Sequence, residues 1–225
     1  SSTACASWPE ATGSWSTSSK PMSVTETTES IIARTRQWIE TVVVGMNFCP
    51  FARREMRRDT VRFIVSPDPD MESVLLQLID ECILLDADDG TQTTLLILPE
   101  GFADFDDYLN LAGLAEDLLA DRGYEGVYQV ASFHPDYRFA DTDADDPANY
   151  TNRSPYPMLH LLREDGLEAA IASYPDPDSI PENNIAKARA LGTDYWLKLM
   201  DELHATDLPT SSVQHLPPEH PMKSF

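Results

Sequence analysis

The feature that most constrains the fold is a regular exchange between two kinds of apolar pattern. Short β-rich runs occupy residues 61–65, 93–98 and 127–133, and amphipathic helical patterns separate them at 71–85 and 105–119. A β-α-β-α-β order with long crossover helices favours neighbouring parallel strands with right-handed connections. We therefore predict an α/β fold with a short, mainly parallel sheet, flanked by helices. The carboxyl ends of its strands would share one edge, where ligands of open parallel sheets gather.

Helical patterns also precede and follow this core. An apolar stripe with helical spacing runs over residues 29–44 and stops at Gly45 and Asn47. Further helices are predicted at 156–163, 167–174 and 180–203, the last with a break at 191–192. The predicted organisation is a flexible extension over 1–28, a single α/β domain over 29–206 and a flexible tail over 207–225. Met22 is a plausible alternative start, which leaves open whether the first 21 residues belong to the native protein.

The net charge of the chain limits the classes of partner that it can bind. A formal charge of −22 argues against nucleic acid and against anionic membrane surfaces as partners. The same excess of Asp and Glu is typical of salt-adapted proteins, so the charge could instead reflect a salty habitat. The cations that do occur gather at residues 53–58 and at Arg153, which predicts a small anionic ligand. Widely spaced cysteines, together with no apolar run long enough to span a bilayer, indicate a reducing, cytoplasmic setting.

Cys49 is the first candidate for chemistry. Pro50 suits the first turn of a helix, which would place Cys49 near the cap, where unpaired amides and nearby arginines, including Arg53, favour the thiolate. This predicts a reactive thiol, whereas the alternative is a cysteine that only packs beside Phe48. Cys82 lies on an apolar helix face and is expected in the core.

A second group of candidates follows the third predicted strand. His134 would lie at the rim of the sheet and could act as a general base. The polar loop after it could hold a carboxylate or phosphate, with His160 returning to the same pocket. Alternatively, His134 only caps the strand and the loop residues only tie the loop down. The loop residues predicted to bind the substrate are Asn152, Arg153, Ser154 and Tyr156.

Two classes of function fit these candidates. The first is a cysteine-dependent transferase, hydrolase or thiol-redox enzyme, with Cys49, His134 and His160 as catalytic groups and an anionic substrate. The alternative is a metal- or haem-binding protein without turnover that uses the same three residues. An adaptor that presents acidic faces to a basic partner is a third hypothesis. The sequence leaves the cofactor, the reaction and the oligomeric state open.

Several segments, taken together, resemble one bacterial family, known as domain of unknown function 1415. The resemblance covers about residues 29–192, and it implies a cytoplasmic protein of a proteobacterium without implying an activity. The tetrad Cys-Pro-Phe-Ala alone also resembles the thiol motif of some glutaredoxins, but the helical period before it does not suit that fold. The segments that carry the family resemblance are WIE at 38–40, NFCPFA at 47–52, TTLLI at 93–97, QVASFHPDY at 129–137, TNRSPYP at 151–157 and HLLRE at 160–164.

Overall fold

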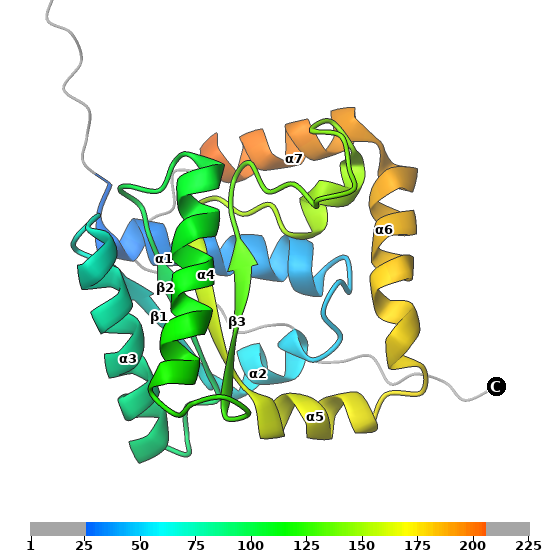
Figure 1. Cartoon of the computed structure of the whole chain (residues 1–225). Coiled ribbons are helices and arrows are strands. Elements are labelled where there is room, and N and C mark those ends of the chain that lie inside the picture. The colour runs from blue at the N-terminus through cyan, green and yellow to red at the C-terminus, as the bar shows by residue number, and fades with distance from the viewer. Residues whose placement is uncertain (1–25, 206–225) are drawn as a thin grey trace, which may run out of the picture.

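The computed structural model describes residues 26–205 and contains one four-stranded mixed sheet (Figure 1). The strands are β1 (Val61–Val65), β2 (Thr93–Ile97), β3 (Tyr128–Phe133) and β4 (Met158–Arg163), in the order β1-β2-β4-β3. Strands β1 and β2 are parallel, whereas β4 runs antiparallel to both β2 and β3. The α/β class is confirmed, and the mainly parallel sheet is corrected to one parallel and two antiparallel pairs.

The difference arises from β4, which the sequence pattern predicted as a helix over residues 156–163. The run Met-Leu-His-Leu-Leu has few polar positions because β4 lies in the middle of the sheet and is covered on both faces. A short apolar run of this kind does not distinguish a strand from a helix by its period. Ile97 and Phe133 both pair with Met158, so β2 and β3 do end at the same edge, as predicted.

Helices α3 (Met71–Ala87) and α4 (Phe105–Asp121) cover one face of the sheet, side by side in Figure 1. Each begins at an aspartate N-cap, because the carboxylates of Asp70 and Asp104 accept backbone N–H groups of the first turn. Their apolar stripes bury Cys82, as expected, against Leu96 and Leu161 of the sheet.

The other face is covered by the remaining helices. These are α1 (Thr28–Trp38), the π-helical segment η1 (Ile39–Val44), α2 (Ala52–Arg58), α5 (Glu164–Ala172), α6 (Ile180–Leu191) and α7 (Thr193–Ala205). The short 3₁₀ turn η2 (Pro147–Thr151) lies between β3 and β4, and η3 (Pro177–Ser179) lies between α5 and α6. The predicted stop after residue 44 is confirmed, with Asn47 in the left-handed region. The predicted break at 191–192 is also confirmed, since Gly192 separates α6 from α7.

The predicted extensions 1–28 and 207–225 lie outside the described residues, apart from the start of α1. Within 26–205, no helix is both long enough and apolar enough to cross a membrane.

Candidate functional site

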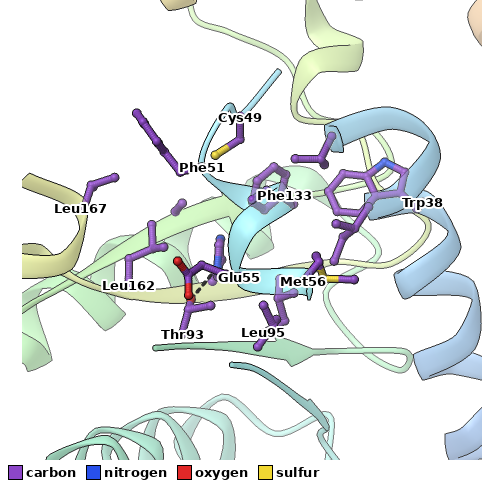
Figure 2. Close-up of a pocket in the computed structure, with 16 residues that line it drawn as sticks. Trp38, Cys49, Phe51, Glu55, Met56, Thr93, Leu95, Phe133, Leu162 and Leu167 are labelled. Atoms are coloured by element: carbon purple, nitrogen blue, oxygen red, sulfur yellow. Dashed lines mark hydrogen bonds between the residues drawn. The ribbon is translucent and has the colours of Figure 1, made fainter. Parts of the chain in front are cut away.

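A pocket of about 230 Å³ lies on the sheet face opposite α3 and α4 (Figure 2). Its floor consists of alternate residues of each strand, because residues two apart on a strand point to the same face. This volume is below the roughly 300–1,000 Å³ of drug-sized ligand sites, so the pocket suits a small molecule. The floor residues are Val61, Thr93, Leu95, Ala131, Phe133, His160 and Leu162.

The roof of the pocket comes from α1, η1, the segment 49–56 and α5. Trp38 is fixed in place, because its indole N–H donates to the Arg153 carbonyl at 2.9 Å and its ring packs edge-on against Phe133. Single π-helical turns are frequent at functional sites, and η1 leads directly into this roof. Gly45 follows it, and a Cβ there would lie 2.3 Å from the Thr41 carbonyl oxygen. The roof residues are Trp38, Ile39, Val43, Cys49, Phe51, Ala52, Glu55, Met56 and Leu167.

Cys49 lines the pocket, across from the strand residues Thr93 and Leu95 in Figure 2. Its sulfur accepts hydrogen bonds from the backbone N–H groups of Phe51 and Ala52, as expected for a cysteine just before α2. The expected low pKa is wrong, however. Burial among apolar side chains raises the thiol pKa, and the two amide hydrogen bonds offset this only in part.

His160 faces the same pocket from β4, and its hydrogen bonds define which ring nitrogen carries the proton. Nε2 lies 2.6 Å from Oγ1 of Thr93, and the same hydroxyl lies 2.6 Å from the Leu161 carbonyl oxygen. A carbonyl only accepts, so the Thr93 hydroxyl donates to it and the Nε2–H of His160 donates to Thr93. Nδ1 therefore carries a lone pair, and it has no partner within residues 26–205. Burial lowers the pKa of this imidazole to about 4, which keeps it neutral at pH 7.

Glu55 is the carboxylate of the pocket wall and was not among the residues selected from the sequence. Burial raises its pKa, but hydrogen bonds from Thr60 and Arg54, at 2.6 Å each, outweigh burial and leave the pKa below its ordinary value. Thr93, which orients His160, was also missed. Their signals were weak, because Glu55 stands within an arginine run and Thr93 within a β-rich run.

His134 does not line the pocket and lies instead against α4. Its ring is fully buried between Phe105 and Tyr108, with centroids 5.1 and 5.0 Å away. Both ring nitrogens are occupied, since the Asp136 N–H donates to Nδ1 and Nε2–H donates to the Phe102 carbonyl, each at 2.9 Å. Burial lowers its pKa as well. The structure thus favours the capping interpretation of His134 over the general base.

Two of the loop residues predicted as substrate ligands, Arg153 and Asn152, bind backbone carbonyls of the loop and of β3. The Arg153 guanidinium donates to the carbonyls of Tyr137 and Ala144 and lies 4.5 Å from the centroid of the Tyr150 ring. Asn152 donates to the Ser132 carbonyl. Asn152 nevertheless comes near Cys49, because both line a second pocket of about 310 Å³ that also contains Phe133.

The other predicted ligands lie away from the main pocket. Ser154 is buried and donates to the Tyr156 carbonyl at 2.6 Å, whereas the Tyr156 hydroxyl accepts from Arg34 at 2.8 Å. Arg53 is exposed and reaches the Val44 carbonyl at 3.4 Å. None of the three lines the pocket that holds Cys49 and His160.

The metal alternative required Cys49, His134 and His160 to converge. The structure places the first and the last in one pocket and His134 outside it. Within residues 26–205, no group of three His, Cys, Asp or Glu side chains is placed to hold a metal ion.

Comparison with known proteins identifies the family only. No curated protein and no solved structure matches the chain. A family model described as "Protein of unknown function (DUF1415)" matches residues 30–198, most of the chain and nearly the range of the resemblance seen in the sequence. The chain therefore belongs to the DUF1415 family.

Proposed function

We propose that the protein is a cysteine-dependent enzyme that acts on a small, largely apolar acyl compound bound in the pocket over the sheet. The observation that carries this proposal is that a thiol and a neutral imidazole with a free nitrogen share one small apolar pocket. Cys49 is the proposed nucleophile and His160 the proposed base. Thr93 fixes the orientation and the tautomer of the His160 ring, the role of the third group in a nucleophile-base-orienter triad.

The reaction begins with attack of the Cys49 sulfur on the acyl carbon of the substrate. The new S–C bond replaces the bond from that carbon to the leaving group, which departs with the electron pair of that bond. The thiol proton passes to Nδ1 of His160 and from there to the leaving group, so the imidazole is neutral again. Among the described residues, no hydrogen bond joins Cys49 to His160, so the proton crosses through the substrate or a water molecule. Attack of water or another acceptor on the thioester then restores the thiol.

The electrostatics of the pocket suit a neutral reacting group. Both Cys49 and His160 are uncharged at pH 7 because burial disfavours their ionic forms. The pocket therefore offers no preformed thiolate-imidazolium pair, and the thiolate forms only during the reaction. This distinguishes the site from the low-pKa thiols of redox proteins.

A burst measurement with p-nitrophenyl hexanoate tests this function. Wild-type protein is expected to release a burst of p-nitrophenolate stoichiometric with enzyme, followed by slower turnover. Cys49→Ser should lose the burst, whereas Cys82→Ser, with its side chain buried in the opposite core, should keep it. His160→Gln should slow turnover by about 100-fold, the lower end of the 10²–10⁴ that a general base contributes, because a pKa of about 4 makes this imidazole a weak base. An unchanged burst in Cys49→Ser would overturn the proposal.

A further inference from the structure

A small chamber with charged residues in a largely apolar wall lies beside the main pocket, between α2 and α5. The two spaces share Phe51, Glu55, Thr93 and two leucines, so they lie side by side. The chamber has a volume of about 70 Å³, room for a group of about two water molecules in size, since one water occupies about 30 Å³. We call this space the side chamber. Residues that line it and not the main pocket are Arg54, Gln92, Arg163, Gly166 and Ala170.

The side chamber carries more positive than negative charge, in a chain that is strongly acidic overall. Its charged lining consists of Arg54, Arg163 and Glu55. Arg163 is held in place by backbone carbonyls, including that of Thr91, and not by a carboxylate. Each oxygen of Glu55 already accepts one hydrogen bond, from Arg54 or from Thr60, which offsets part of its negative charge.

Arg54 is the group free to bind a ligand. Its Nε donates to Glu55 at 2.6 Å, while its two terminal nitrogens have no partner within residues 26–205. The side chain is 58% exposed, so it can turn toward the chamber without losing a buried contact. A guanidinium edge of this kind is suited to a bidentate contact with a carboxylate.

Cys49 and the side chamber lie toward opposite ends of the main pocket. Cys49 shares a pocket with Phe133, at the level of Ile97 in the sheet, whereas the side chamber contains Thr93 and Leu162. These two levels are four residues apart along β2 (97 − 93), or roughly 13 Å at about 3.3 Å per residue. The floor between them consists of apolar side chains and His160.

We propose that the substrate is an amphipathic acyl compound whose anionic group occupies the side chamber beside Arg54 and whose apolar chain extends over the sheet, with the reacting acyl group at its other end beside Cys49. This inference rests on the proposed function and names its substrate class. The expected anionic ligand is retained, but its anchor is Arg54 and not the loop around Arg153. A neutral molecule of equal length would leave the two terminal nitrogens of Arg54 without an anionic partner.

Calorimetric titration with octanoate and with the neutral octanamide tests the proposal in the full chain. Wild type should bind octanoate at least about tenfold more tightly, and Arg54→Gln should remove that difference. Arg58→Gln is the matched control, because it removes the same charge from the same helix at a residue that lines neither space. Melting temperatures establish that both variants fold.

Two results would overturn the assignment: equal affinity of wild type for the two ligands, or equal loss in the two variants. A separate result would overturn only the proposed function. If octanoate binds through Arg54 while Cys49 fails to form an acyl-enzyme with p-nitrophenyl hexanoate, the anion site stands and the thiol chemistry does not.

Discussion

Replacing His160 with glutamine should make the protein less sensitive to acid. In the folded protein, burial holds the pKa of His160 at about 4, against 6.5 for a free histidine. Below pH 6.5, His160 is therefore protonated in the unfolded chain but stays neutral in the folded protein until the pH approaches 4. The stability linked to this residue is fully present above pH 6.5 and is lost as the pH falls toward 4.

The magnitude follows from the same two values. A difference of one in pKa corresponds to about 1.4 kcal/mol, so the full difference would amount to about 3 kcal/mol, of which about 2 kcal/mol is lost between pH 7 and pH 5. His160 is only partly buried by its surface area, which reduces the expected loss to about 1–2 kcal/mol. Glutamine keeps an N–H that can donate to Thr93 but does not titrate.

Urea unfolding at pH 7 and pH 5 measures this effect. The free energy of unfolding of His160→Gln should fall by about 1–2 kcal/mol less than that of wild type over this interval. His134 and the carboxylates contribute equally to both proteins, so the difference belongs to His160. If both proteins lose the same stability, His160 titrates normally, and the buried neutral imidazole is refuted.

Three further predictions concern residues on either side of the pocket. Alkylation of Cys49 by iodoacetamide should be slow at pH 7 and should accelerate above pH 9, because burial raises the thiol pKa. Cys82, which has a pKa of about 12 and no exposed surface, should react only when the protein unfolds. Fast labelling of Cys49 at pH 7 would contradict this prediction. His134→Ala should lower the free energy of unfolding by about 2–5 kcal/mol, because it removes two buried hydrogen bonds and leaves a cavity. The octanoate affinity of the folded protein should not change. Weaker octanoate binding would show that His134 belongs to the site. Arg153→Ala should lower the free energy of unfolding in urea by about 1–3 kcal/mol, because the N–H groups of Arg153 bind loop carbonyls. The burst amplitude should not change. Loss of the burst without loss of stability would show that Arg153 belongs to the substrate site.

The sequence predicted the elements of the fold better than their pairing. The helices α3 and α4 and the strands β1, β2 and β3 carry clear periods and distinct end signals. The strand β4 does not, because a central strand covered on both faces has no polar alternation. Its insertion between β2 and β3 depends on contacts between distant segments, which a local pattern does not encode.

The candidate site was predicted in part for the same reason. Cys49 and His160 were both selected and do share a pocket, although His160 reaches it from a strand and not from the predicted helix. His134 was correctly placed at the end of β3, but Phe133 is the residue that faces the pocket. Consecutive residues point to opposite sides, so a rim position alone did not determine which face the imidazole would occupy.

The pocket itself is tested most directly by filling it. Ala131 lies on the floor of the pocket and pairs with His160 in the sheet. Ala131→Phe would therefore place a large ring beside His160 while Cys49 itself stays unchanged. Mass spectrometry should show Cys49 of wild type acylated by p-nitrophenyl hexanoate, and Ala131→Phe blocked against the hexanoyl group but still alkylated by the smaller iodoacetamide at pH 9. Equal hexanoylation of the two proteins would contradict the claim that this pocket binds the substrate.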